Sequence, residues 1–192
     1  MQFRSSSTLP PGLLPLESRK LALCDPVTMH APVGRKLPTL VAMMAVAPLW
    51  LRAVGATETG RVRTENEDRF VIREDLQLFL VADGAGGHAA GDIAATVATR
   101  SIENFLEATA AEQAALPEVD RAGIPKAARW LARAVHKANR DVYEIASTHA
   151  GSTGMGSTVV AALSVPRTGQ LQIAHVGDSR CYRSRAGLCE LL

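Results

Sequence analysis

The sequence predicts an α+β fold, a β-sandwich flanked by a pair of long antiparallel helices. Three observations support this class: short apolar runs separated by turn residues from about residue 52, two long segments with helical periodicity, and further short apolar runs near the end. Strands grouped before and after a helix pair are typical of α+β folds rather than of alternating β-α-β units. With 47% hydrophobic and 21% charged residues among 192, the composition is that of a soluble globular domain.

The first predicted elements are strands. Arg52–Thr57 is interpreted as an edge strand, and Arg69–Arg73 and Gln77–Ala82 flank the turn residues Glu74–Asp75, which indicates a β-hairpin. Asp83–Gly91 follows, with four glycines in nine residues. Glycine density of this kind predicts an irregular tight loop.

Two helices come next. Apolar residues recur at helical spacing from Ile93 to Leu106, so the first helix is expected to end near residues 108–111. Residues 112–124 are polar and predict a connection without regular structure. A second apolar stripe at residues 127–145 predicts the second helix.

Short apolar runs return after the glycine-rich residues 151–156, and no internal repeat is visible. We expect a turn at 166–169 and strands at 158–165, 171–176, 181–184 and 188–192.

The first 51 residues have a different character, and we interpret them as a disordered or wrongly assigned leader before a folded domain over 52–192. Leu37–Leu51 is apolar and follows two basic residues, but it is too short for a standard membrane-spanning helix. A secretion signal would fit only if the chain began at Met29. This segment decides nothing about localisation; from the cysteine content we expect a cytoplasmic protein without membrane association.

Charge and cysteine content narrow the range of partners. The net charge of +2 gives no reason to expect nucleic acid as a partner, and we expect a monomer. The three cysteines, Cys24, Cys181 and Cys189, lack metal-ligand spacing, which favours a reducing compartment. Cys181 and Cys189 could face each other across a short hairpin, although buried free thiols are the commoner outcome.

Acidic residues stand at three places where a predicted strand meets a loop: Glu67-Asp68, Asp83-Gly84 and Asp178. Carboxylates near a core are costly unless a positive charge compensates them. Mg²⁺ and Mn²⁺ are suitable partners, because they prefer oxygen ligands and too few His or Cys residues lie nearby for zinc. Each cluster taken alone is also consistent with an ordinary turn, a solvated loop or a local ion pair.

Four motifs in a fixed order support the prediction of a metal site. Arg63-Thr-Glu-Asn-Glu67-Asp68, VADGAGGHAAG at 81–91, GSTVV at 156–160 and HVGDSR at 175–180 follow one another. Together they resemble the type 2C (PPM) family of metal-dependent Ser/Thr protein phosphatases, bacterial-like members in particular. The resemblance covers about residues 52–192. It implies hydrolysis of phosphoserine and phosphothreonine in phosphorylated proteins by a metal-activated water, with a Ser/Thr kinase as an upstream partner.

The resemblance also implies a set of metal ligands. Asp83 is similar to the carboxylate that bridges two Mn²⁺ or Mg²⁺ ions, with the carbonyl of Gly84 completing one site. Glu67 resembles the acidic ligand of the second ion, and Asp68 its neighbour that orients bound waters. Asp178 corresponds to a ligand of a third, weaker ion.

For the substrate, Arg63 matches the arginine that holds the phosphate, to which a guanidinium is well suited. Some family members place a histidine two residues after the bridging aspartate, where this chain has Ala85. His88 is the remaining general-acid candidate in that loop, and a loop-stabilising role is its alternative.

The family continues past the Gly-Asp-Ser-Arg turn with more strands and helices and two further aspartates, which residues 181–192 do not provide. The resemblance therefore implies a partial domain with its C-terminal part absent. The alternative function is a catalytically dead remnant that binds phosphopeptides or a kinase. A nucleotide-phosphate site is disfavoured, because the glycine-rich loop lacks a Gly-Lys-Ser/Thr ending.

Overall fold

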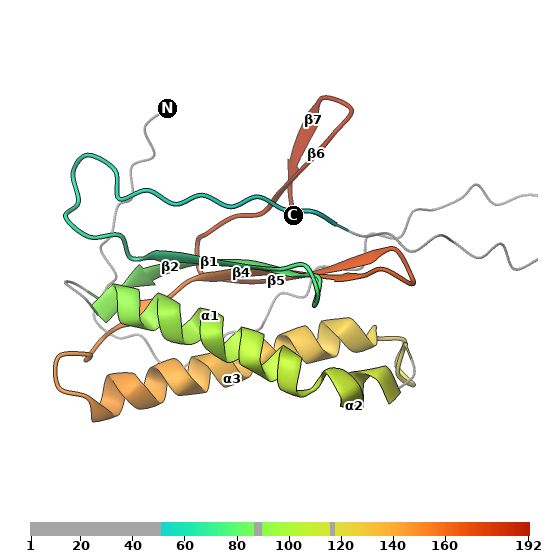
Figure 1. Ribbon diagram of the computed structural model, residues 1–192, viewed down its shortest axis with the longest axis horizontal. Helices are drawn as coiled ribbons and strands as arrows, with labels where there is room; N and C mark the ends of the chain where they lie inside the picture. Colours follow the sequence, from blue (N-terminus) through green and yellow to red (C-terminus); the bar gives the residue numbers. More distant parts are fainter. Residues whose placement is uncertain (1–50, 87–89, 116–117) are drawn as a thin grey trace, which may run out of the picture.

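The computed structural model describes residues 51–86, 90–115 and 118–192 (Figure 1). Its helices are α1 (Ala90–Ala108), α2 (Ala110–Ala115) and α3 (Lys126–Thr148). Its strands are β1 (Asp68–Arg73), β2 (Leu78–Ala85), β3 (Gly156–Ser157), β4 (Val159–Val165), β5 (Gln170–Val176), β6 (Tyr182–Arg185) and β7 (Leu188–Leu191).

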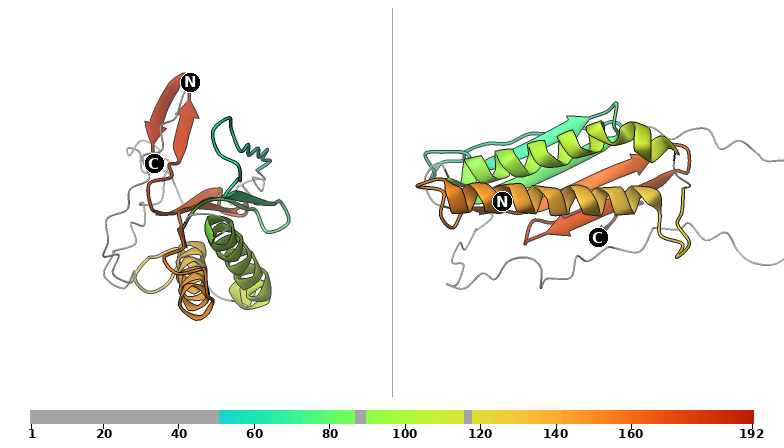
Figure 2. Two further views of the ribbon diagram at one scale, coloured as in Figure 1. Left: turned by 90° about the vertical axis from the view of Figure 1, so that its left-hand side faces the viewer. Right: turned by 90° about the horizontal axis from the view of Figure 1, so that it is seen from below.

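One antiparallel sheet organises the described residues, with its strands in the order β1-β2-β4-β5. The short strand β3 pairs with the end of β2, and β6 and β7 form a separate two-stranded sheet. α1 and α3 run antiparallel to each other along one face of the main sheet (Figures 1 and 2). α1 packs on β1 and β2, and α3 packs on β4 and β5.

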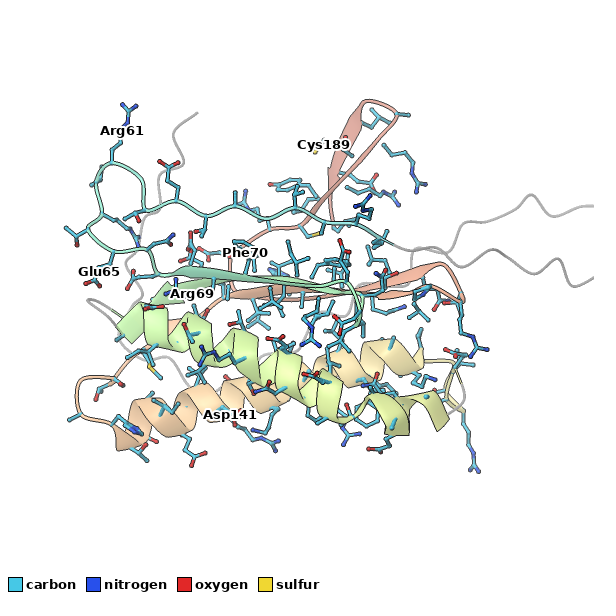
Figure 3. All side chains as sticks on the ribbon, in the orientation of Figure 1. Arg61, Glu65, Arg69, Phe70, Asp141 and Cys189 are labelled. Atoms are coloured by element: carbon cyan, nitrogen blue, oxygen red, sulfur yellow. The ribbon has the colours of Figure 1, made fainter. Side chains whose placement is uncertain are left out.

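Alternation along β2 shows why the helices cover only one face. Leu78, Leu80 and Ala82 are buried on the helix side, whereas Val81 lies between them and is 48% exposed on the other side. β1 follows the same rule, with Phe70 on the open side and its neighbour Arg69 directed toward α1 (Figure 3).

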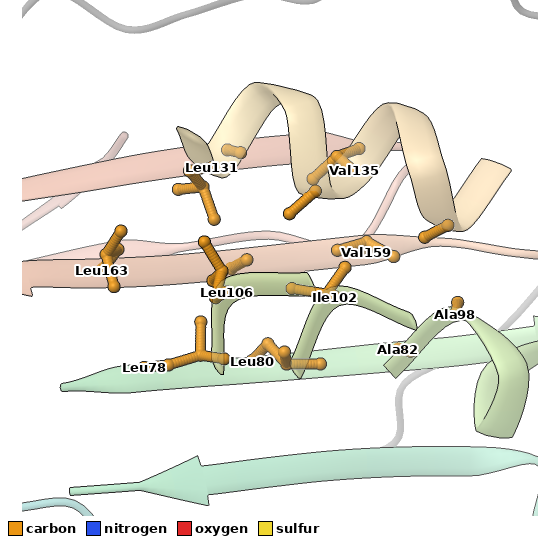
Figure 4. Close-up of a cluster of buried hydrophobic side chains, with 14 of the residues drawn as sticks. Leu78, Leu80, Ala82, Ala98, Ile102, Leu106, Leu131, Val135, Val159 and Leu163 are labelled. Atoms are coloured by element: carbon orange, nitrogen blue, oxygen red, sulfur yellow. The ribbon is translucent and has the colours of Figure 1, made fainter. Parts of the chain in front are cut away.

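The core lies between this sheet face and the helix pair (Figure 4). Ile102 of α1, Leu131 of α3 and Leu78 of β2 are almost wholly buried there. Small residues separate the large ones on the helices, among them Ala98 and Ala134, and let the backbones approach the sheet closely. The predicted helical stripes therefore form the core, and the helix pair of the predicted fold is confirmed.

The face of the sheet opposite the helices carries the segment 51–67 and the β6–β7 hairpin (Figures 1 and 2). The backbone N–H of Leu51 donates to Gln77 Oε1 at 2.8 Å, and Gly55 lies against the ring of Phe70. The predicted edge strand at Arg52–Thr57 is wrong, because this segment crosses over the sheet face and pairs with no strand edge.

Two further predictions need correction. Asp83, Gly84 and Ala85 continue β2 instead of opening a loop, because β3 supplies pairing partners for Gly84 and Ala85. The helix α2 occupies the start of the predicted polar connection. The α+β class is confirmed; β6 and β7 form a separate two-stranded sheet that projects from the side of the main sheet opposite the helices (Figure 1).

The register of the β6–β7 hairpin shows that Cys181 and Cys189 do not face each other. Ser184, not Cys181, stands opposite Cys189. Cys181 lies at the open end, where its carbonyl accepts a hydrogen bond from the N–H of Leu192 at 3.0 Å. Among the described residues, neither Cys181 nor Cys189 forms a disulfide bond; Cys181 is half-buried and Cys189 is exposed.

The predicted leader lies outside the described residues except for Leu51, so the domain boundary at residue 52 stays a prediction. Among the helices that the structure describes, none combines the length and the apolar character needed to cross a membrane.

Candidate active site

Residues from three elements meet at one end of the main sheet. Asp68 begins β1 and stands directly opposite Asp83, near the end of β2. Asp178 follows β5, which is linked to β2 through β4. The topology therefore brings together three predicted site residues that are far apart in the sequence.

Local hydrogen bonds shape the segment before β1. Asn66 Oδ1 accepts the backbone N–H of Asp68 at 2.9 Å, and Asn66 Nδ2 donates to Thr57 Oγ1 at 2.8 Å. Arg63 Nη1 donates to Glu67 Oε2 at 2.9 Å. The predicted phosphate-binding arginine and the predicted metal ligand thus form one ion pair.

Arg69 links the segment before β1 to α1 through hydrogen bonds and an ion pair. The sequence motifs did not indicate this role. Its guanidinium forms an ion pair with Asp92 in the first turn of α1, and its Nε donates to Thr96 Oγ1 at 3.2 Å. Nη1 of the same side chain donates to the carbonyl of Asn66 at 3.1 Å. Glu67 and Asp68 are therefore held between the sheet and the start of α1.

Two glycines allow α1 to begin very close to β2. A Cβ atom on Gly84 would overlap the carbonyl group of Gly91 and would lie 2.9 Å from the carbonyl oxygen of Glu67. A Cβ atom on Gly91 would lie 2.7 Å from Glu67 Cδ. The backbone N–H of Gly84 donates to the Glu67 carbonyl at 3.2 Å. Glycine at position 84 therefore lets the backbone of α1 approach β2, and glycine at position 91 leaves room for the carboxylate of Glu67.

The carboxylate of Glu67 is only partly satisfied. Its side chain is 13% exposed, and its Oε1 is buried without a hydrogen-bond partner. A buried carboxylate oxygen that lacks a partner has a substantial free-energy cost. This atom marks a position where a positive charge or a donor would be stabilising.

Asp83 also lies in an environment where a positive charge would be stabilising. Burial raises the pKa of its carboxyl above the ordinary value, and the nearby carboxyl of Asp68 raises it further. Asp178 adds to this effect, whereas the positive charge of Arg63 opposes it. The carboxyls of Asp68 and Asp178 thus disfavour ionisation of Asp83, and a cation placed beside Asp83 would offset this effect.

Thr158, a residue of the GSTVV motif, joins two parts of the site. The backbone N–H of Asp83 donates to Thr158 Oγ1 at 3.1 Å, and the N–H of Thr158 donates to the Asp83 carbonyl at 2.9 Å. Thr158 Oγ1 also lies 2.6 Å from Ser179 Oγ, next to Asp178.

The predicted residues therefore divide into two groups. Arg63, Asp68 and Asp178 act electrostatically on Asp83, and Glu67 joins this group through its ion pair with Arg63 and through its contact with the strand end. His88 lies outside the described residues, so its predicted role stays a prediction.

The donor set fits a hard divalent cation better than any other metal, because it consists of carboxylate and carbonyl oxygens. Within residues 51–86, 90–115 and 118–192, no three His, Cys, Asp or Glu side chains stand close enough to hold a metal ion as they are. The fit therefore rests on the partnerless Glu67 Oε1 and on the neighbouring carboxyls that disfavour ionisation of Asp83.

Known proteins are similar to this chain over the same region. The family model "Protein phosphatase 2C" matches residues 58–192. The serine/threonine phosphatase stp of Listeria monocytogenes is 35% identical over 129 residues, which cover 66% of this chain and 47% of that protein.

Solved structures agree with this match. The catalytic domain of the serine/threonine phosphatase PstP, in complex with two manganese ions, has a TM-score of 0.55 at 28% identity, covering 69% of this chain and 50% of that chain. The phosphatase MsPP from Mycobacterium smegmatis, in complex with cacodylate, has a TM-score of 0.57 at 30% identity, covering 74% and 53%. The chain spans about half the length of these relatives. With the family model matching most of the chain and these structures sharing its fold, this protein belongs to the protein phosphatase 2C family.

Proposed function

We propose that this site hydrolyses phosphoserine and phosphothreonine esters of proteins with the help of two Mn²⁺ or Mg²⁺ ions, and a third near Asp178. The observation that carries the proposal is the excess of carboxylate oxygen at one end of the sheet, including the partnerless Oε1 of Glu67, next to an arginine. Family membership supports it, as does the manganese complex of PstP.

Asp83, the carbonyl of Gly84 and Glu67 are the residues that we assign to the metal ions, with Asp68 and Asp178 beside them. Divalent cations, when bound, lower the pKa of water and offset the charge of the phosphate. The role of the protein is to hold the carboxylates in place. Asp83 is fixed on β2 by its hydrogen bonds with Thr158, and Glu67 by the close approach of Gly84 and Gly91.

Arg63 is the residue that we assign to the substrate phosphate. Its side chain is 48% exposed and is held at one nitrogen by Glu67. A guanidinium carries five N–H donors in a fixed plane, and this geometry matches the oxygens of a phosphate group. Neutralising those oxygens favours attack by water, because negative charge develops on them in the transition state.

Turnover of a phosphothreonine peptide by the full chain, with and without Mn²⁺, tests the proposal. Mn²⁺-dependent turnover is expected, and Asp83→Asn should abolish it. Asp75→Asn is a matched control, because it makes the same chemical change in the turn at the opposite end of the β1–β2 pair. Folded protein that shows no turnover at any Mn²⁺ concentration would refute the proposal and favour a phosphopeptide-binding remnant.

His88 is proposed as the general acid, and a pH–rate profile of His88→Gln tests this assignment. Loss of the alkaline limb of the profile is expected, whereas an unchanged profile would show that another group donates the proton. A Ser/Thr kinase as upstream partner, a cytoplasmic location and a monomeric state are predictions of the same kind; size-exclusion chromatography tests the last.

A further inference from the structure

The motif GSTVV at 156–160 supplies no metal ligand and no phosphate contact in the proposed chemistry, yet its threonine contacts both halves of the site. We propose that Thr158 is a positioning residue that sets the placement of Asp83 relative to the turn carrying Asp178. The inference rests on the proposed function, because its consequence is the affinity of the site for divalent cations.

Thr158 holds the backbone of Asp83. It bonds to this backbone in both directions, accepting the N–H of Asp83 on Oγ1 and donating its own N–H to the Asp83 carbonyl. Ser157 Oγ adds a hydrogen bond to the same carbonyl at 3.2 Å. The peptide groups on both sides of Asp83 are therefore tied to the corner between β3 and β4, and its side chain is left to face the other carboxylates.

Thr158 also contacts the turn after β5. Thr158 Oγ1 accepts one hydrogen bond from Asp83, so its own proton is available for Ser179 Oγ at 2.6 Å. The opposite polarity, with Ser179 as donor, also satisfies both hydroxyl groups. In either case one oxygen atom links the backbone of Asp83 to the residue that follows Asp178.

The methyl group of Thr158 supports the same turn from the side. Gly177 has a φ angle of +98°, and a Cβ atom there would lie 2.7 Å from Thr158 Cγ2. The turn can dock this closely only because residue 177 is glycine. His175 Nε2 lies 2.9 Å from the Gly177 carbonyl and bridges the turn from the β5 side.

Threonine thus combines two functions that separate substitutions can divide. Thr158→Val keeps the shape and the methyl contact but removes the hydroxyl group, whereas Thr158→Ser keeps the hydroxyl group and removes the methyl group. Ser179→Ala removes only the far end of the link. Thr168→Val is the matched control, because this exposed turn residue lies at the other end of β4.

The experiment measures Mn²⁺ affinity of the full chain by calorimetric titration, with the melting temperature of the metal-free protein in parallel. Substituting residues that orient metal ligands typically weakens affinity by about 10- to 100-fold. We expect a loss in this range for Thr158→Val and Ser179→Ala, and affinity near that of the wild type for Thr158→Ser and Thr168→Val. The double variant Thr158→Val/Ser179→Ala should bind no more weakly than the weaker single variant, since both break one link.

Equal Mn²⁺ affinity in Thr158→Val and wild type would overturn the inference while leaving the proposed function intact. Absence of Mn²⁺ binding in the wild type would count against both. The amide resonance of Asp83 decides the link itself without metal: Ser179→Ala should shift it through Thr158, and an unchanged resonance would show that no link exists.

Discussion

The backbone of Gly84 in β2 lies against the backbone of Gly91 in α1. We therefore expect that a single methyl group at Gly84 is enough to separate α1 from the sheet. The Cβ atom of Gly84→Ala would overlap the Gly91 carbonyl group and lie 2.9 Å from the carbonyl oxygen of Glu67. These obstacles are backbone atoms, which cannot rotate away as a side chain can. The first turn of α1 therefore has to move, together with Glu67.

Two opposing terms set the magnitude. Alanine restricts the unfolded chain more than glycine does, which stabilises the native state by about 0.4–1 kcal/mol where the backbone angles allow it. Gly84 has no positive φ angle, so this gain applies. Overpacking against a rigid neighbour costs about 1–3 kcal/mol or more. Because the second term is larger, we expect the free energy of unfolding to fall by about 1–2 kcal/mol.

Gly156→Ala is the matched control, because Gly156 lies on β3 beside the same strand end and a Cβ atom there meets nothing within 4 Å. Only the favourable term applies, so this variant should be as stable as the wild type or more so. The two variants should differ by about 1–3 kcal/mol, so thermal unfolding followed by circular dichroism should separate their melting temperatures by roughly 4–12 °C, at about 4 °C per kcal/mol for a domain of this size. Equal melting temperatures would show that the close contact between Gly84 and Gly91 is not the reason for glycine at position 84.

Three further outcomes are expected. Hydrogen bonds from Arg73 lower the pKa of Asp75 to about 2, so its stabilising effect is present above about pH 4 and is lost as the pH falls through 2; the difference in melting temperature between wild type and Asp75→Asn should shrink over this interval, and a constant difference would contradict it. Ile102→Ala should cost about 2–5 kcal/mol in urea unfolding and Ile93→Ala on the same helix far less, because Ile102 is fully buried and Ile93 is 40% exposed; similar losses would argue against the described core. Val81→Thr keeps the size of the side chain and should lower binding of the dye ANS at an unchanged melting temperature, since Val81 is exposed on the open sheet face; undiminished dye binding would locate the exposed apolar surface elsewhere.

Local pattern was sufficient to predict the two long helices, although it missed the short helix α2. The apolar stripe that starts at Ile93 predicted a helix ending near residues 108–111, and α1 covers Ala90–Ala108. Periodicity works here because the helix buries one face against the sheet. The same approach failed for Arg52–Thr57, since a strand needs a partner edge and no property of the segment itself indicates whether one is present.

The site was predictable only in part, for a similar reason. Asp83 and Gly84 were expected in a loop, because glycine density is a local signal for irregular structure. The partners that keep them in β2, Gly156 and Ser157, lie more than 70 residues further along the chain. Arg63, Glu67 and Asp83 were selected from motifs, whereas the role of Thr158 depends on a contact with Ser179 that no spacing rule indicates.

The pairing of β2 with β4 has a consequence for the order of folding. Asp83 and Thr158 are 75 residues apart in sequence, and the helices α1, α2 and α3 lie between them. The β1–β2 hairpin and each helix can form from neighbouring residues, but the central strand pair requires closure of this long loop, and non-local pairing of that kind slows folding. Asp83 gains its Thr158 partner only at that step. During refolding, the appearance of cation affinity should therefore coincide with the slow phase, after most helical signal has already returned.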